Sequence, residues 1–310
     1  MIMVRRLLHC IIAAFLALPL LLYGCHKQEP VLLEERPTPL TFLFFSDTQA
    51  DPEIGDYSAL GELLAQAVKV GRKPTLAIFG GDTVNVGGDA DEWQEFWQAA
   101  ETPLAGLTTA VVAGNHDSHT LLAEQFDYPR QAPSGQGEGF FYSFDFAPVH
   151  FIMLDSNIMG AAKQKDVKWL RDDLQSEATR QAIWRIAVMH HPMWPVVENP
   201  KDAARAATMR EHFLPLLEAG GVDLILCGHQ HVFALSLPMR GAAASDDGSG
   251  IIQIMAASGA KESYVVGNRG YVVLINPGPN YLLLTADDTE ISIAAYDEHG
   301  EDWDISVIAR

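Results

Sequence analysis

The chain has 310 residues, of which 48% are hydrophobic, enough for one large core or two smaller ones. Acidic residues number 40 against 21 basic ones, a formal net charge of −19. Because phosphate backbones are held mainly by Lys and Arg, this balance argues against a nucleic acid polymer as partner. A small phosphorylated substrate stays compatible with it if bound cations supply positive charge locally.

The first 24 residues resemble a bacterial lipoprotein signal peptide. A pair of arginines precedes the apolar run 7–22, and Gly24-Cys25 follows it directly. The resemblance implies cleavage before Cys25 and a lipid anchor on it. The residue after this cysteine is His26 rather than an Asp, which in such lipoproteins favours the outer membrane facing the periplasm. An uncleaved membrane anchor is the alternative, because a run of this length approaches a short transmembrane helix. Both interpretations predict export to the bacterial cell envelope and attachment to a membrane.

Residues 25–39 are charged and Pro-containing, without hydrophobic periodicity. They predict a tether to a single domain over residues 40–310. Cys227 is the one cysteine of that domain, so the mature chain has no internal disulfide to form. Its position inside an apolar run predicts a small buried side chain.

Strands and helices alternate along the first part of the domain. Apolar runs predict strands over 41–46, 75–80, 107–113, 140–146, 149–154, 184–189 and 222–227. Helical spacing predicts helices over 58–70, 91–102, 121–126, 166–174 and 203–219, the last kinked or split at Pro215. From residue 232 the pattern changes to short β segments. The alternation indicates an α/β domain, whose site is expected at the carboxyl ends of its strands.

Metal-type side chains directly follow the apolar runs. They occur in Asp47-Thr48-Gln49, Gly81-Asp82, Gly114-Asn115-His116-Asp117, His190-His191-Pro192 and Gly228-His229-Gln230-His231. Imidazole together with carboxylate suits Zn, Mn, Fe or Ni. Two such ions, roughly 3.5 to 4 Å apart and bridged by one carboxylate, clamp a phosphoryl group and generate hydroxide between them.

The order of these motifs resembles the calcineurin-like metallophosphoesterase superfamily, whose pattern runs D-x-H, G-D, G-N-H-D/E, H, G-H-x-H. The resemblance covers residues 41 to about 235, and 140–145 and 150–156 resemble its secreted, purple-acid-phosphatase-like branch. It implies two mixed β-sheets packed face to face with helices outside, the late strands supplying the second sheet. It also implies hydrolysis of a small phosphomonoester or phosphodiester by attack of metal-bound hydroxide.

The resemblance also implies a role for each motif residue. One metal ion (Mn, Fe or Zn) would be held by Asp47 and His231, the other by Asn115, His190 and His229, with Asp82 bridging and His116 as the acid for the leaving oxygen. The spacing alone does not choose between His190 and His191, and the resemblance favours the first. Loops 117–139, 194–205 and 258–264 would border the cleft and decide between monoester and diester, which the sequence leaves open together with the oligomeric state.

Gln49 departs from the family pattern, which commonly has His there. It is assigned to the metal set as a weak amide ligand, and hydrogen bonding beside the site is an equal alternative. Purple acid phosphatases also lack this His but carry a Tyr three residues after the G-D aspartate, where this chain has Asn85. We therefore expect no tyrosinate-to-iron absorption in the visible spectrum of the iron-loaded protein. Gln49 also keeps a second function open, a catalytically impaired envelope lipoprotein that binds a phosphorylated or cell-wall partner.

Overall fold

A computed structural model describes residues 39–51, 55–71, 73–130, 140–159, 163–267, 269–303 and 306–309. The predicted signal peptide and nearly all of the tether therefore lie outside the described residues. Among the helices of the described ranges, none combines the length and apolar character needed to cross a membrane.

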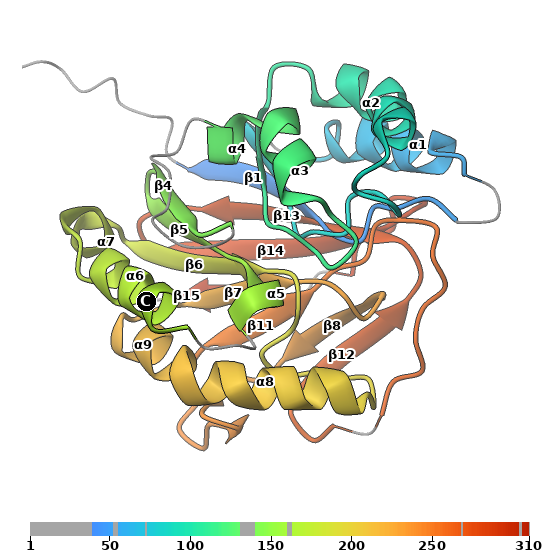
Figure 1. The fold of residues 1–310 in the computed structure, drawn as a ribbon. Coiled ribbons are helices and arrows are strands. Elements are labelled where there is room, and N and C mark those ends of the chain that lie inside the picture. The colour runs from blue at the N-terminus through green and yellow to red at the C-terminus, as the bar shows by residue number, and fades with distance from the viewer. Residues whose placement is uncertain are drawn as a thin grey trace, which may run out of the picture. The chain divides into compact units, whose positions relative to one another are not determined.

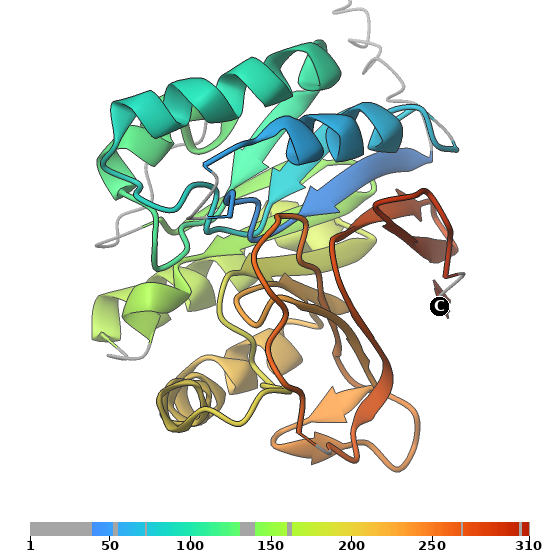
Figure 2. The same ribbon diagram turned by 90° about the vertical axis from the view of Figure 1, so that its right-hand side faces the viewer.

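The first sheet has six strands in the order β15-β14-β13-β1-β2-β3 (Figure 1). Its parallel part consists of β1 (Leu40–Phe45), β2 (Leu76–Phe79) and β3 (Thr108–Val111). The antiparallel part consists of β13 (Asn280–Ala286), β14 (Glu290–Asp297) and β15 (Ser306–Ala309). The helices that follow β1, β2 and β3 in the chain are α1 (Ser58–Ala67), α2 (Ala90–Leu104), α3 (His119–Gln125) and α4 (Asp127–Arg130). Figure 2 shows α1 and α2 lying along one face of β1 and β2.

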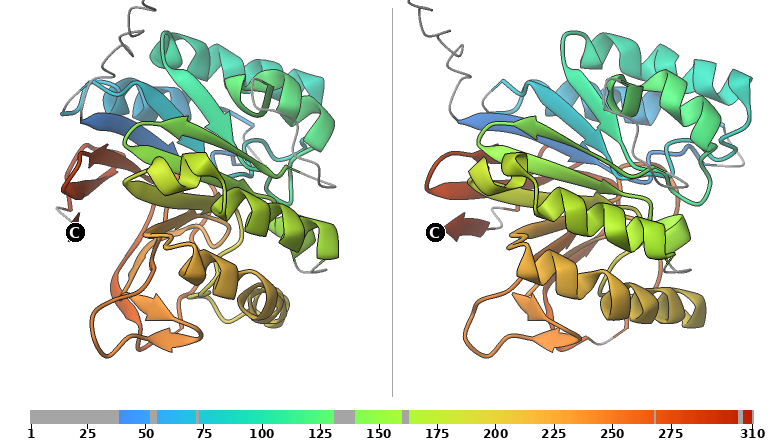
Figure 3. Two further views of the ribbon diagram at one scale, coloured as in Figure 1. Left: turned by 90° about the vertical axis from the view of Figure 1, so that its left-hand side faces the viewer. Right: turned by 60° about the vertical axis from the view of Figure 1, so that its left-hand side comes forward.

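The second sheet has seven strands in the order β12-β8-β11-β7-β6-β5-β4. They are β4 (Tyr142–Phe146), β5 (Val149–Leu154), β6 (Trp184–Met189), β7 (Leu224–Cys227), β8 (Val232–Ser236), β11 (Ile252–Met255) and β12 (Val272–Pro277). A short hairpin pairs β9 (Met239–Arg240) with β10 (Ala243–Ala244). The helices are α5 (Ser156–Met159), α6 (Gln164–Leu174), α7 (Glu177–Gln181), α8 (Pro200–His212) and α9 (Leu214–Ala219), and Figure 3 shows α6, α8 and α9 along this sheet.

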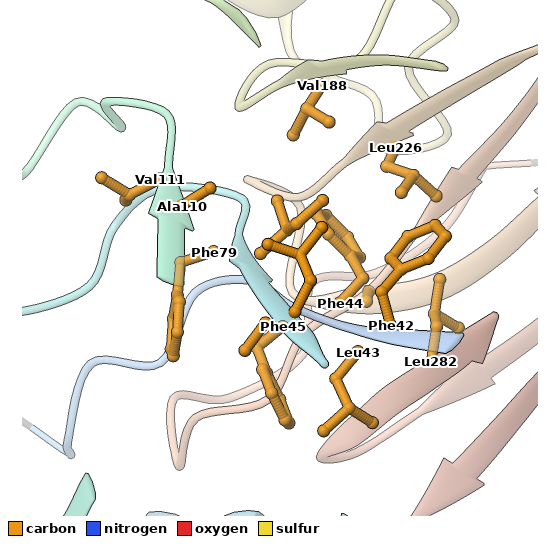
Figure 4. Close-up of a cluster of buried hydrophobic side chains, with 14 of the residues drawn as sticks. Phe42, Leu43, Phe44, Phe45, Phe79, Ala110, Val111, Val188, Leu226 and Leu282 are labelled. Carbon is orange, nitrogen blue, oxygen red and sulfur yellow. The ribbon is translucent and has the colours of Figure 1, made fainter. Parts of the chain in front are cut away.

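The faces of the two sheets meet in an aromatic core. All six positions of β1 are buried, as expected for a strand covered on both faces. Phe42 of β1 packs edge to face on Phe151 of β5, with ring centroids 5.2 Å apart. Figure 4 shows Phe42 on the side of Leu226, while Leu43 extends to the opposite side of β1. The predicted α/β fold of two mixed sheets flanked by helices is confirmed.

Two expectations are corrected by the structure. The late strands do not form the second sheet by themselves: β13, β14 and β15 extend the first sheet, and β8, β11 and β12 extend the second. The reason is that β13 pairs antiparallel with β1, a contact between residues more than two hundred positions apart that no local pattern reveals. In addition, the helix predicted over 91–102 extends to Leu104 as α2, so that Pro103 lies inside its last turn. The predicted break near Pro215 is confirmed, because α8 and α9 separate at Phe213.

Candidate metal centre

The carboxyl ends of parallel strands from both sheets lie together and carry the predicted ligands. Backbone hydrogen bonds join these ends: Asp47 N–H donates to the Gly81 carbonyl (3.0 Å), and Gly228 N–H donates to the His190 carbonyl (3.0 Å). The two sheets are also linked directly, because His229 N–H donates to Asp47 Oδ2 (2.8 Å). The topology therefore brings five separate segments of the chain to one place, as the sequence predicts.

The backbone at this place is strained. The described residues include four non-glycine residues with positive φ, namely Asp47 (50°), Asp82 (50°), His229 (74°) and His231 (49°). All four are predicted ligands. Left-handed backbone costs on the order of 1 kcal/mol or more for such residues and collects at functional sites, where the surrounding structure enforces it.

Two motif glycines allow the chain to pass close to the carboxylates. A Cβ on Gly114 would lie 2.1 Å from Asp82 Oδ1, and a Cβ on Gly228 would lie 2.1 Å from Asp47 Oδ2. These distances are far below van der Waals contact. The glycines of the G-N-H-D and G-H-x-H motifs are therefore required by the close approach of backbone to carboxylate.

Asp82, His190 and His229 form one group of candidate ligands. Their ligand atoms lie within 4.8 Å of one another. His190 Nε2 is 3.2 Å from Asp82 Oδ2 and 3.3 Å from His229 Nδ1. Such a group of one carboxylate and two imidazoles is a donor set that suits Mn, Fe or Zn.

Each candidate histidine is fixed by a hydrogen bond at its other ring nitrogen. His190 Nδ1 lies 2.9 Å from the Gly80 carbonyl, His229 Nε2 lies 3.1 Å from Asp202 Oδ1, and His231 Nδ1 lies 3.3 Å from the Glu262 carbonyl. These acceptors orient the rings and leave the inward nitrogen unprotonated in the neutral form. Metal-binding histidines in proteins almost always show this arrangement.

Asp47 and His231 form the second group. His231 Nε2 lies 3.4 Å from Asp47 Oδ1, and this oxygen is buried without a hydrogen-bond partner among the described residues. Asp47 Oδ2, in contrast, accepts from Ser46 Oγ and from His229 N–H, both at 2.8 Å. A buried carboxylate oxygen left without a donor beside an imidazole nitrogen fits a cation site.

The Gly114–Asp117 turn presents the remaining motif residues. Asn115 is exposed, and His116 N–H donates to Asp82 Oδ1 (2.8 Å). Asp117 closes the turn by accepting from the backbone N–H groups of Asp82 (2.8 Å), Thr83 (3.0 Å) and Gly114 (2.8 Å). His116 Nδ1 lies 2.8 Å from the Asn85 carbonyl, so the ring is held beside the bridging candidate Asp82.

The charges in the site are coupled. Burial opposes ionisation of Asp82, but the neighbouring His190 and the His116 N–H lower its pKa below the usual carboxyl value. Burial likewise opposes charge on His190, yet Asp82 raises its pKa to about 9. Asp82 is therefore ionised in the folded protein, as a carboxylate that binds a cation must be.

The structure separates His190 from its neighbour. His191 is buried, and its Nδ1 lies 2.9 Å from Ser156 Oγ. It is not part of the candidate ligand group around Asp82. Burial, together with the neighbouring His190 and His229, lowers the pKa of His191. Its ring packs on His229 with centroids 4.2 Å apart, so it supports the site as a neutral neighbour.

Gln49 lies under the site and is fully buried. In the amide orientation that satisfies both ends, its Nε2 donates to the Asp82 carbonyl (2.9 Å) and its Oε1 accepts from Lys261 Nζ (2.9 Å). Both amide atoms of Gln49 thus have hydrogen-bond partners, as expected if Gln49 forms hydrogen bonds beside the site instead of binding metal. Metal ligation by Gln49 stays a prediction.

Two residues of the site escaped the sequence analysis. Asp202, near the start of α8, contacts His229 and also accepts from Gln230 Nε2 (2.8 Å). Lys261 follows β11 in the loop 258–264. Neither lies in a motif, but both lie in loops that the sequence analysis expects to border the cleft. A further local signal is Asn199, whose side chain accepts from the N–H groups of Lys201 and Asp202 at the start of α8.

Part of the chain is similar in sequence to known proteins. Purple acid phosphatase 23 of Arabidopsis thaliana is 26% identical over 149 residues, covering 46% of this chain and 32% of that protein. The uncharacterized protein Rv2577 of Mycobacterium tuberculosis is 25% identical over 226 residues, covering 66% of this chain and 41% of that protein. The chain thus spans about a third to two fifths of the length of such relatives.

Solved structures show the same fold. Purple acid phosphatase PPD1 from yellow lupin superposes with a TM-score of 0.72 at 16% identity, covering 88% of this chain and 54% of that one. GAP50, the anchor in the inner membrane complex of Plasmodium, superposes with a TM-score of 0.63 at 16% identity, covering 87% and 88%. A sequence model of the family "Calcineurin-like phosphoesterase" matches residues 40–233, well over half of the chain. With the motif residues gathered where both sheets end, the chain belongs to the calcineurin-like phosphoesterase family.

Proposed function

We propose that this protein is a metal-dependent hydrolase of small phosphoesters. The observation that carries the proposal is a set of three imidazoles, each fixed at one nitrogen by an acceptor. The other nitrogen of His190 and of His231 faces a buried carboxylate, and that of His229 faces His190. Family membership supports the same general activity. The net charge of −19 supports a small substrate rather than a nucleic acid polymer.

The proposed site would hold two ions, as the resemblance to the family implies. Asp47 and His231 would hold one, Asn115, His190 and His229 the other, and Asp82 would be shared. When bound, such ions supply positive charge to a phosphoryl group and a nucleophile at neutral pH. Carboxylate and imidazole suit Mn, Fe and Zn alike.

His116 is suited to protonate the leaving oxygen. Since a carbonyl oxygen can only accept, Nδ1 of His116 keeps its proton in the bond to the Asn85 carbonyl. The proton that the ring can give up is therefore the one on Nε2. A histidine positioned this way works as a general acid near neutral pH.

Hydrolysis assays test the proposal. Protein loaded with Mn or Zn is expected to hydrolyse p-nitrophenyl phosphate or bis-p-nitrophenyl phosphate, and chelation or Asn115→Ala is expected to abolish the activity. If loaded wild-type protein hydrolyses neither compound nor any member of a broad phosphoester panel, the enzyme proposal fails.

A second candidate, a binding protein on the same scaffold, is favoured by one observation. At the position where the family commonly has a ligand His, Gln49 has both amide atoms engaged in hydrogen bonds. Such a protein would bind a phosphorylated or cell-wall partner without turnover. Elemental analysis separates the two candidates, because bound metal supports hydrolysis and its absence from carefully loaded protein supports binding alone.

We also propose that the protein is exported and lipid-anchored in the cell envelope. The proposal rests on the apolar run 7–22 followed by Gly24-Cys25. Expressed in a bacterium fed labelled palmitate, the wild-type chain is expected to carry the label and Cys25→Ala to lose it. Equal labelling of both, or of neither, would contradict the lipoprotein assignment.

A further inference from the structure

The loop 258–264, which follows β11, is fastened to the Asp47–His231 half of the site. Ser258 N–H donates to the Ser46 carbonyl (2.7 Å), and Gly259 N–H donates to the Asp47 carbonyl (2.9 Å). A Cβ on Gly259 would lie 2.4 Å from that same Asp47 oxygen, so the loop packs directly against the backbone of the candidate metal ligand Asp47. At its other end Tyr264 stacks on the His231 ring, with centroids 4.8 Å apart and planes inclined by 20°.

This loop brings an ammonium group to the site. Lys261 Nζ lies 2.9 Å from Gln49 Oε1, and the same amide donates through Nε2 to the Asp82 carbonyl (2.9 Å). Gln49 is fully buried, whereas Lys261 is half-buried. A fixed amide thus holds the end of a flexible side chain beside the backbone of the central carboxylate.

The position of Lys261 matters because Gln49 is where the chain departs from its family. The family commonly places a metal-binding imidazole there, whereas this chain places a neutral amide with a cation attached to it. An ammonium has three donors, and the bond to Gln49 uses one. Among the described residues this nitrogen has no other hydrogen-bond partner, so its other two donors can serve a small anion. Phosphate oxygens are strong acceptors for such donors.

We propose that Lys261 binds the phosphoryl group of the substrate on the Asp47–His231 side of the site, positioned by Gln49. This inference rests on the proposed function and identifies a group that the family motifs do not contain. It has a second consequence. A fixed positive charge weakens a cation bound nearby by Coulomb repulsion, so the ion at Asp47 and His231 is the more weakly held one.

Calorimetric titration with inorganic phosphate tests the proposal on the full protein, metal-free and Mn-loaded. In Lys261→Met, which keeps the unbranched shape and most of the length of the side chain but removes its ammonium group, phosphate binding is expected to weaken roughly ten- to a hundredfold in the Mn-loaded protein. Lys261→Arg is expected to retain most of the affinity. Lys69→Met, a change at an exposed lysine after α1, is the matched control and is expected to bind like wild type.

Titration with Mn²⁺ gives the second readout. Lys261→Met is expected to bind the weaker ion more tightly, whereas damage to the fold would weaken phosphate and metal binding together. Thermal melting checks that the variant folds. If Lys261→Met does not fold, Lys261→Gln is used for the same comparison.

Two results would overturn the proposal: phosphate binding by the folded Lys261 variant within about twofold of wild type, or no phosphate binding by wild type at all. Failure of the proposed function looks different. If wild-type protein binds phosphate through Lys261 but hydrolyses no phosphoester, the proposed enzymatic function is wrong and the proposed role of Lys261 in phosphate binding still holds.

Discussion

At the level of single residues, the site is built from pairs in which one side chain fixes another. Asp202 is the clearest case that lies outside the motifs, since it holds His229 through Nε2 and leaves Nδ1 facing His190. It also fixes Gln230, whose side-chain oxygen accepts from Val196 N–H (2.8 Å). Asp202 therefore connects α8 to the G-H-x-H motif.

We expect Asp202→Ala to lower metal affinity roughly ten- to a hundredfold, the usual cost of losing a carboxylate that orients a metal-binding histidine. Competition with a chromophoric chelator measures the affinity. Asp172→Ala, on the exposed side of α6, serves as the control and is expected to leave it unchanged. Unaltered metal affinity in Asp202→Ala would show that His229 does not depend on this contact.

The role proposed for His116 predicts a dependence on the leaving group. His116→Ala is expected to lower kcat by roughly 10² to 10⁴ for phenyl phosphate, and by much less for p-nitrophenyl phosphate, whose leaving group needs little protonation. Metal content is expected to stay at the wild-type level. The exposed His212 provides the control variant, His212→Ala. Equal losses on both substrates would argue against an acid role.

At the level of elements, a buried histidine joins a hairpin to a helix. His150 of β5 contacts Asp145 of β4 through Nδ1 (2.8 Å) and Asp173 of α6 through Nε2 (3.2 Å). Burial opposes its charge, but hydrogen bonds to the two carboxylates prevail and raise its pKa to about 9. The ion pairs lie apart from the metal motifs and tie α6 to the edge of the second sheet.

This pKa predicts how stability changes with pH. The folded-state value lies above the unfolded value of 6.5, so the contribution is complete below pH 6.5 and is lost as the pH rises through about 9. Thermal melting from pH 6 to 10 is expected to show a larger fall in Tm for wild type than for His150→Gln. His299→Gln, at an exposed position, is the control. Parallel curves for wild type and His150→Gln would refute the charged pair.

The elements around the site could be predicted because their signals are local. Apolar runs such as those just before Asp47 and His190 predict both a strand and where it ends. They therefore also predict where the candidate ligands that follow will lie. Helix limits were less accurate, as Pro103 shows by lying within α2. A proline in the last turn of a helix removes one hydrogen bond, and the packing of the helix can offset that loss. The sequence pattern does not show which of the two effects is larger.

At the level of the whole molecule, the sequence could not reveal which strands share a sheet. The pairing of β13 with β1 and of β11 with β7 depends on long-range packing. Loop 258–264 reaches the site because β11 lies parallel to β7, with Met255 opposite Cys227, one residue before the G-H-x-H motif. For this reason the sequence could place Lys261 only within a loop bordering the cleft, whereas it identified His229 by its motif.

The central claim is that the residues gathered where the two sheets meet hold metal for phosphoester hydrolysis. The most direct measurement is a Mn²⁺ titration of metal-stripped protein with hydrolysis of bis-p-nitrophenyl phosphate followed alongside, in wild type and in His190→Ala. The account predicts that wild-type activity rises with bound Mn²⁺ and that His190→Ala loses both the tightly held ion and the activity. Full metal binding and hydrolysis in His190→Ala, or neither in wild type, would contradict it.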